Sequence, residues 1–295
     1  HIFVSQLTKI YRVPERQPGL AAAFKSLFQR EYRAVEAVRD ISFEIGRGEM
    51  VGLIGPNGAG KTTTLKVLSG LLYPTSGDVQ VAGFTPWERK SDYLRRISMV
   101  MGNRSQMIWD IPPLDSFRVL GEIYGVPSAE YDRTLDELVA LLDLQELLHK
   151  PVRNFSLGER MKCELVAGLL YQPEVLFLDE PTLGLDVSMQ RRLRRFLAEY
   201  NQRKAVTAIL TSHYMADVVE LCPRVILIHH GELIYDGALE GLAARLSPFK
   251  LIQLTLNSTA ASASNQFPPG VEIIQQDNGN LTLRVARKET AAVAA

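Results

Sequence analysis

The chain has 295 residues, of which 33 are basic and 33 acidic, so its formal net charge at pH 7 is zero. Because no field of one sign covers the protein, the composition does not favour binding to nucleic acid or to an anionic membrane surface. Two cysteines, Cys163 and Cys222, are too few for a disulfide framework and belong to no metal-ligand pattern, which favours a reducing, cytoplasmic setting. No apolar stretch approaches the roughly 18 residues that a membrane-spanning helix needs. The length predicts one large domain, alone or with a small appendage.

The first elements expected along the chain are strands, with an unusual addition before them. The segment "ISFEI" at 41–45 alternates apolar and polar side chains as a half-buried strand does, and "MVGLI" at 50–54 is typical of a short, fully buried strand. Residues 12–36 look like an addition to the fold. Their segment "FKSLFQREYR" at 24–33 predicts a short amphipathic helix, which could pack on its own domain or on a membrane or a partner.

A glycine-rich loop, "GPNGAGKTT", follows the buried strand and precedes the helical pattern "TLKVLSGLL". The loop fits G-x-x-x-x-G-K-[ST]. Glycine lets such a loop turn its N–H groups toward an anion, and the positive end of the next helix dipole adds to the attraction. We therefore expect a nucleoside triphosphate here, with Lys61 against its β- and γ-phosphates and the Thr62 hydroxyl on Mg²⁺. The expected nucleotide contacts are the consecutive residues Gly55, Pro56, Asn57, Gly58, Ala59, Gly60, Lys61, Thr62 and Thr63.

Further buried strands are expected at "VLFLD" (175–179) and "VTAILTS" (206–212), with helical patterns at 131–149 and 188–200. Buried strands that alternate with helices imply a parallel sheet covered on both faces. About a hundred residues separate the helix after the glycine-rich loop from "VLFLD", which is too many for one crossover connection. We therefore expect an inserted, mostly helical subdomain over about 106–172.

The end of the chain is expected to form a smaller domain. Strand patterns at "LIQLTLN", "VEIIQQ" and "LTLRVAR" surround the turn "DNGN", and "KETAAVAA" reads as the opening of a helix. These patterns predict an accessory α+β domain over 247–295, incomplete at its C-terminal end, after a main domain over 1–246.

Two carboxylates and a histidine are expected at the sheet edge that carries the glycine-rich loop. Asp179 and Glu180 end the strand "VLFLD", and His213 follows "VTAILTS", so all three emerge at the carboxyl ends of strands, where open α/β sheets bind ligands. We expect Asp179 to hold Mg²⁺ through water, Glu180 to accept a proton from the attacking water, and His213 to reach the γ-phosphate. The acids could instead cap a loop, and a lone histidine in such a loop is often incidental. The other motifs favour the catalytic interpretation.

The order of these motifs resembles that of the nucleotide-binding subunit of an ABC transporter, over residues 4 to about 245. The resemblance rests on Tyr11 in "LTKIYRV", "GPNGAGKTT", Gln106 in "MGNRSQMIWD", "FSLGER" at 155–160, "LFLDEP", "LGLD" ending at Asp186, and His213. It implies an α/β P-loop NTPase with a central parallel sheet, an antiparallel β-subdomain and an inserted helical subdomain. It also implies ATP and Mg²⁺ as cofactors, adenine stacking on Tyr11, and Gln106 as a Mg²⁺ ligand and coupling residue.

The segment "FSLGER" departs from the family's usual L-S-G-G-Q. Ser156 and Gly158 match, whereas Leu157 replaces the first glycine and Glu159 replaces the glutamine. Ser156 is expected to begin a helix, so its hydroxyl and the helix N-terminus still form an anion site, which the charge of Glu159 could weaken. In the family this segment faces the phosphate loop of a second copy. Because one chain carries both half-sites, the resemblance implies a head-to-tail homodimer that holds two ATP molecules.

The resemblance implies a motor subunit that binds and hydrolyses ATP for an ABC membrane transporter, similar to bacterial exporters with separate membrane subunits. The expected contact with those permease subunits, on the cytoplasmic face of the cell membrane, is the groove around Gln106 and "IWDIPPLDSF". An alternative is a soluble ABC-type ATPase acting on ribosomes or chromosomes. The chain lacks a second cassette, long heptads and a basic face, so no nucleic-acid partner is expected. A metabolic P-loop kinase, the third alternative, would not need "FSLGER".

Overall fold

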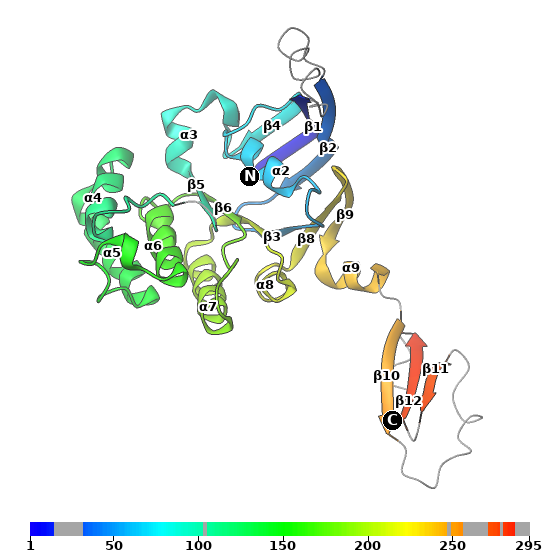
Figure 1. The fold of residues 1–295 in the computed structure, drawn as a ribbon. Coiled ribbons are helices and arrows are strands. Elements are labelled where there is room, and N and C mark those ends of the chain that lie inside the picture. The colour runs from blue at the N-terminus through cyan, green and yellow to red at the C-terminus, as the bar shows by residue number, and fades with distance from the viewer. Residues whose placement is uncertain (15–31, 103–104, 247–248, 256–270, 278–279, 287–295) are drawn as a thin grey trace, which may run out of the picture. The chain divides into compact units, whose positions relative to one another are not determined.

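The computed structural model describes residues 1–14, 32–102, 105–246, 249–255, 271–277 and 280–286 (Figure 1). The chain divides into two compact units, His1–Asp236 and Gly237–Ala295. This division falls ahead of the boundary expected at residue 246. Among the described helices, none combines the length and the apolar character that a membrane span requires.

The first unit contains an antiparallel sheet in the order β2-β1-β4, with bounds β1 Ile2–Pro14, β2 Tyr32–Ile45 and β4 Ser76–Val81. At the end of β2, Ile41, Phe43 and Ile45 are buried while the residues between them are exposed. Their alternation confirms the half-buried strand predicted at 41–45, because side chains of a strand point to opposite faces in turn.

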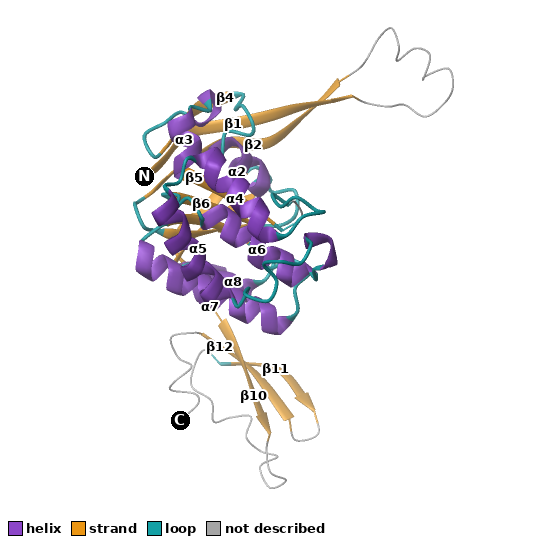
Figure 2. Cartoon of the chain, turned by 90° about the vertical axis from the view of Figure 1, so that its left-hand side faces the viewer, coloured by secondary structure: helices purple, strands orange, loops and turns teal. Residues whose placement is uncertain are grey.

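The pairing of β1 with β2 corrects part of the helix predicted at 24–33. Tyr32 and Arg33 pair with Pro14 and Val13 in a long hairpin (Figure 2). These two residues are strand because the extension of β1 supplies their hydrogen-bond partners. The remainder of the predicted helix lies outside the described residues.

The central sheet has the strand order β5-β6-β7-β3-β8-β9. Neighbouring strands from β5 through β8 run parallel. The edge strand β9 runs antiparallel to β8, because only His230 and Gly231 connect the two. The sheet is therefore mixed rather than wholly parallel. The strands are β3 Met50–Ile54, β5 Ile97–Met101, β6 Val175–Asp179, β7 Thr207–Thr211, β8 Arg224–His229 and β9 Glu232–Ala238.

Helices cover the central sheet and also form a group beside it (Figures 1 and 2). The helix α2 contacts β2, β4 and β6, so it lies between the two sheets, whereas α8 contacts β3 and α7. The helices α4, α5 and α6 gather beside β5, in the interval where the inserted helical part is expected. The helices of the first unit are α2 Lys61–Leu68, α3 Ser91–Arg96, α4 Pro113–Tyr124, α5 Ser128–Leu142, α6 Leu157–Leu169, α7 Val187–Lys204 and α8 Met215–Leu221, with 3₁₀ turns at Pro86–Glu88 and Val152–Asn154.

The helix predicted over 131–149 is shorter than its apolar pattern suggests. It ends at Leu142, because Asp143 adopts a left-handed conformation with φ of 51° and donates its N–H to the Val139 carbonyl. This geometry is a common way to end a helix. The helix predicted over 188–200 is confirmed as α7.

The second unit contains the helix α9 Leu239–Leu246 and an antiparallel sheet in the order β10-β12-β11. Its strands, β10 Phe249–Thr255, β11 Glu272–Asp277 and β12 Asn280–Ala286, confirm the three that were predicted. Leu281, Leu283 and Val285 form its small buried core. The helix predicted at "KETAAVAA" lies outside the described residues.

Candidate nucleotide site

The glycine-rich loop connects β3 to α2 and can be built only with glycine at two positions. Gly55 has φ of 148°, and a Cβ there would lie 2.0 Å from the Ile228 carbonyl oxygen. Gly60 has φ of 109°, and a Cβ there would lie 2.4 Å from the Ala37 carbonyl oxygen. Any larger residue would push the loop away from β8 and β2. The loop borders a cavity of about 260 Å³, lined by Ala37, Asn57, Gly58, Ala59, Gly60, Lys61, Thr62, Thr63 and Glu180.

The Lys61 side chain folds back across this loop. Its Nζ donates hydrogen bonds to the carbonyl oxygens of Gly55 at 2.7 Å and Pro56 at 3.0 Å. Burial lowers the pKa of Lys61, while the nearby carboxylates of Glu180 and Asp179 act in the opposite direction. The ammonium is thus held at the cavity wall beside both acids, where a polyphosphate would neutralise it.

Thr62 and Asp179 place two oxygen ligands together at the floor of the site. Asp179 Oδ1 accepts hydrogen bonds from Thr62 Oγ1 at 3.1 Å and from Thr211 Oγ1 at 2.7 Å. A hydroxyl and a carboxylate oxygen are ligands that Mg²⁺ prefers, with water and phosphate oxygens completing its octahedron. These residues therefore fit the expected metal.

Gln106 is not brought to this pair of oxygens. Among the residues that the structure describes, its hydrogen bonds run from the main-chain N–H to Glu164 Oε2 at 2.8 Å and from the side-chain amide to the Met99 carbonyl at 3.4 Å. The side chain is exposed. Its role as a Mg²⁺ ligand remains a prediction that would require the amide to turn toward Asp179.

Glu180 and His213 face each other at the ends of neighbouring strands. The distance from Glu180 Oε1 to His213 Nε2 is 2.7 Å. Glu180 has φ of 54°, and its N–H donates to the carbonyl of Thr211 at 3.0 Å and to its Oγ1 at 3.1 Å. A left-handed backbone conformation costs conformational energy for a glutamate, so it persists only where neighbouring residues fix it. Such strained backbone is frequent at functional sites. Thr211, at the end of β7, thus fixes the main chain of Glu180, whose carboxylate is expected to act as the base.

Behind Glu180 and His213 lies a buried polar cluster that sequence reasoning missed. The Asp217 carboxylate accepts hydrogen bonds from Thr182 Oγ1 at 2.5 Å, Ser212 Oγ at 2.6 Å and Arg194 Nη1 at 2.8 Å. Thr182 follows Glu180 by two residues and Ser212 precedes His213, so the cluster joins the loops that carry Glu180 and His213. A charged residue beside the buried Val218 and Leu221 of α8 was the available signal.

The segment "FSLGER" forms the start of α6. Ser156 caps the helix: its Oγ accepts from the Glu159 N–H at 3.3 Å, and Glu159 Oε2 accepts from the Ser156 N–H at 2.8 Å. This reciprocal arrangement is a capping box. Glu159 therefore completes the helix start in place of the family's glutamine. Neither Ser156 nor Gly158 lines the cavity of the glycine-rich loop.

Tyr11 lies on the hairpin that borders the site. It pairs with Val35, and Ala37, two residues further along β2, lines the cavity. The pairing register shifts between Lys9 and Ile10, where Ala37 is the extra residue of β2, so the pairing alone does not fix which face Tyr11 shares with Ala37. Tyr11 does not line the cavity of the glycine-rich loop, and its stacking on a base remains a prediction.

A phosphate-binding loop at the edge of an α/β sheet, with a helical insertion that ends in a capped helix, defines the class of ATP-binding cassettes. The family model described as "ABC transporter" matches residues 38–183. The ABC transporter ATP-binding protein NatA of Bacillus subtilis (strain 168) is 35% identical over 215 residues, 73% of this chain and 87% of that protein. The chain therefore belongs to the family of ABC transporter ATP-binding subunits, and it binds and hydrolyses ATP.

Other comparisons agree with this assignment. The linearmycin resistance ATP-binding protein LnrL of Bacillus subtilis (strain 168) is 33% identical over 232 residues, 78% of this chain and 73% of that protein. A solved ATP-binding subunit of an ABC transporter has a TM-score of 0.68 at 27% identity, covering 83% of this chain and 92% of its own. A dimeric bacterial ABC transporter cassette shares the fold, with a TM-score of 0.65 at 21% identity, over 81% of this chain and 99% of its own.

Proposed function

We propose that this chain is the motor subunit of a membrane exporter, in which ATP binding closes a head-to-tail dimer and hydrolysis reopens it. The observation that carries the proposal is the 2.7 Å contact between Glu180 and His213, beside the paired oxygens of Thr62 and Asp179. A carboxylate next to a phosphate loop and a metal site can take a proton from water aimed at the terminal phosphate.

Each residue of the site has a part in this reaction. Glu180 accepts the proton of the attacking water, and His213 orients the Glu180 carboxylate and reaches the γ-phosphate. Lys61 and the loop N–H groups hold the β- and γ-phosphates. Thr62 and Asp179 hold Mg²⁺, which when bound neutralises charge on the phosphate oxygens. Gln106 completes the site when its amide turns toward them.

Head-to-tail pairing would place Ser156 of one copy on the nucleotide of the other. Ser156 is exposed at the N-terminus of α6, outside the cavity of its own phosphate loop. An exposed helix N-terminus with a serine hydroxyl is suited to a phosphate supplied by a second molecule. The dimeric cassette with the same fold supports this arrangement.

Exposed apolar side chains support a docking surface for membrane subunits near Gln106. Ile108, Trp109 and Ile123 are 47%, 48% and 66% exposed. Ile108 and Trp109 are adjacent in the stretch that follows Gln106, and exposed apolar side chains that form one patch are typical of a protein–protein contact. LnrL, a resistance protein, supports the export direction. We place the subunit on the cytoplasmic face of the membrane, with residues 247–295 as an accessory domain.

Phosphate release by the purified protein tests the motor proposal first. We expect ATP hydrolysis that depends on Mg²⁺, and loss of ATP binding in Lys61→Ala without loss of the folded state. Turnover that is unchanged by metal chelation would contradict the assignment of Thr62 and Asp179.

Co-purification tests the membrane contact. The chain would be expressed with any multi-span membrane protein that is encoded beside it, and Trp109→Ser should weaken the complex. Tyr73→Ser is the matched control, since Tyr73 is 63% exposed and belongs to the segment before β4, whose Thr75 N–H donates to the Thr8 carbonyl of β1. Co-sedimentation with ribosomes or retention on DNA, without any membrane partner, would favour the alternative ATPase.

A further inference from the structure

A buried carboxylate on α6 holds the main chain around Gln106. Glu164 is 4% exposed. Its Oε2 accepts from the Gln106 N–H at 2.8 Å, and its Oε1 accepts from the Met107 N–H at 3.4 Å and from the Ser105 hydroxyl. Burial raises the pKa of Glu164, and these hydrogen bonds act in the opposite direction. Among the described residues no cation pairs with Glu164, so the segment 105–107 supplies its polar partners.

The chain passes from the central sheet to the helical group within a few residues. The Gly102 N–H donates to the Asp179 carbonyl at 3.0 Å, which ties Gly102 to β6. From Ser105 onward the bonds run to the helices instead: Ile108 N–H donates to Ser116 Oγ of α4 at 3.3 Å. Gln106 therefore belongs by its main chain to the helical group, and only its side-chain amide reaches the sheet, at 3.4 Å.

The helix that carries Glu164 also carries the signature segment. Ser156 caps α6, and Glu164 follows about two turns later on the same uninterrupted helix. A rigid helix moves as one body. The N-terminus of α6 thus carries Ser156, which is proposed to contact the nucleotide of a second copy. The middle of α6 carries Glu164, which is hydrogen-bonded to Gln106, the residue proposed to contact the chain's own Mg·ATP.

We propose that Glu164 is a positioning residue that fastens Gln106 to the signature helix, so that movement of α6 toward a second copy's nucleotide carries Gln106 with it. The inference rests on the proposed function, and it adds a physical link between the two ATP sites of the dimer. Glu164 itself touches neither nucleotide. It acts through the N–H groups of Gln106 and Met107.

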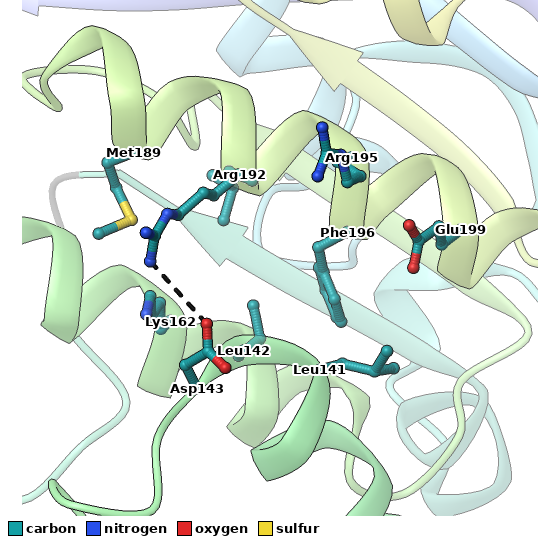
Figure 3. Close-up of a pocket in the computed structure, with 10 residues that line it drawn as sticks. Leu141, Leu142, Asp143, Lys162, Met189, Arg192, Arg195, Phe196 and Glu199 are labelled. Carbon is teal, nitrogen blue, oxygen red and sulfur yellow. Dashed lines mark ion pairs between the residues drawn. The ribbon is translucent and has the colours of Figure 1, made fainter.

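The substitution Glu164→Gln tests the link with little change in volume. A carboxamide has one acceptor oxygen, and its NH₂ group would face the N–H donors that the second carboxylate oxygen now binds. The matched control is Lys162→Met on the same helix. Lys162 is buried and lines a different cavity, of about 300 Å³ between α5, α6 and α7 (Figure 3). It forms no hydrogen bond or ion pair with the residues described here.

Hydrogen exchange measures the fastening directly. We expect slow exchange of the Gln106 and Met107 N–H groups in the parent protein and in Lys162→Met, and at least tenfold faster exchange in Glu164→Gln. Should melting curves show that Glu164→Gln does not fold, Ser105→Ala removes one donor of the same carboxylate and is measured instead. Unchanged exchange at both positions overturns the proposal, whatever the activities are.

A double-mutant cycle of ATP turnover measures the consequence. A misplaced Gln106 should lower kcat by roughly tenfold with KM for ATP within about twofold, since a small displacement of a reacting group is costly. In a Gln106→Ala background, Glu164→Gln should have no further effect, because both changes remove one function. Independent, multiplying losses would overturn the link. If exchange is fast in Glu164→Gln but Gln106→Ala is fully active, the hydrogen bonds from Gln106 and Met107 to Glu164 are confirmed. The role of Gln106 in the proposed function is then contradicted.

Discussion

Nε2 of His213 lies 2.7 Å from Oε1 of Glu180, although the two residues follow different strands. The strands β6 and β7 are parallel neighbours in which Asp179 pairs with Thr211, so the residues just beyond them emerge side by side. The imidazole can donate to the carboxylate and hold it in one orientation, while the other carboxylate oxygen is left for water.

The first prediction concerns Glu180→Gln. The amide keeps the shape of the side chain but cannot take a proton, so turnover should fall by roughly 10²- to 10⁴-fold. ATP binding should survive, because Lys61, Thr62 and Asp179 are unchanged. Phosphate release and binding of labelled ATP measure the two effects. Light scattering with ATP and Mg²⁺ against ADP should show that the variant accumulates as a dimer.

Two outcomes would revise this account. A variant that binds ATP but stays monomeric would indicate that the altered signature segment cannot close the site without membrane subunits. Hydrolysis at the parent rate would remove Glu180 from the mechanism and make His213 the residue to test.

The parts of the site that the sequence predicts are local. The glycine-rich loop is read from consecutive residues, because strand, loop and helix follow one another and Gly55 and Gly60 are needed where they stand. The capped start of α6 is local in the same way, with Ser156 and Glu159 three positions apart. Buried strands such as "VLFLD" are equally readable from their apolar runs.

Contacts between distant residues escaped prediction. Thr182 and Asp217 are 35 residues apart, and Gln106 and Glu164 are 58 apart, so no periodicity links them. The strand conformation of Tyr32 was hidden for the same reason, since it depends on pairing with Pro14. Polar side chains in otherwise apolar helix faces, Asp217 and Glu164, were the available hints.

A second prediction concerns Tyr11 as the adenine platform. Tyr11→Ala should weaken ATP binding by about 1 to 3 kcal/mol, the scale of base–aromatic stacking, and Tyr11→Trp should be tolerated. Isothermal titration with ATP in the Glu180→Gln background measures this without turnover. The control is Tyr32→Ala, because Tyr32 lies further out on the same hairpin, opposite Pro14. If Tyr11→Ala leaves the affinity for ATP unchanged and Tyr32→Ala lowers it, the adenine contacts Tyr32 rather than Tyr11.

A third prediction concerns the two thiols. Burial raises the pKa values of both Cys163 and Cys222 to about 12, from an ordinary value of 9.0. The native protein therefore keeps both protons at pH 8, and neither thiol should react with a disulfide reagent until the first unit unfolds. Because the unfolded chain loses these protons at lower pH than the native chain, stability should fall as pH rises from about 9 toward 12. Rapid labelling of either thiol in the folded protein would contradict its burial.

The fourth prediction concerns Asp217, which is fully buried and pairs with Arg194, itself 6% exposed. Asp217→Ala would leave the guanidinium with only the half-exposed Glu220, 2.5 Å from its Nε, and the hydroxyls of Thr182 and Ser212 without their acceptor. Removal of one member of a buried ion pair typically costs about 3 to 5 kcal/mol of unfolding free energy. The expected loss should be visible in urea unfolding followed by tryptophan fluorescence, since Trp87 and Trp109 both lie in the first unit.

A comparison with an exposed ion pair shows how much of the stability loss in Asp217→Ala comes from burial of the charges. Arg192→Ala removes the partner of Asp143, but that pair is 3.9 Å apart with both side chains more than half exposed, so its loss should cost less than about 1 kcal/mol. The double variant Asp217→Leu with Arg194→Met removes both buried charges and should recover part of the stability lost in Asp217→Ala, because the one ion left unpaired, Glu220, is half exposed to water. Turnover should stay low in that double variant, since Thr182 and Ser212 would no longer tie the Glu180 loop to the His213 loop. Equal losses for Asp217→Ala and Arg192→Ala would show that the buried cluster does not stabilise the fold. Full turnover in the double variant would show that the cluster does not position the loops that carry Glu180 and His213.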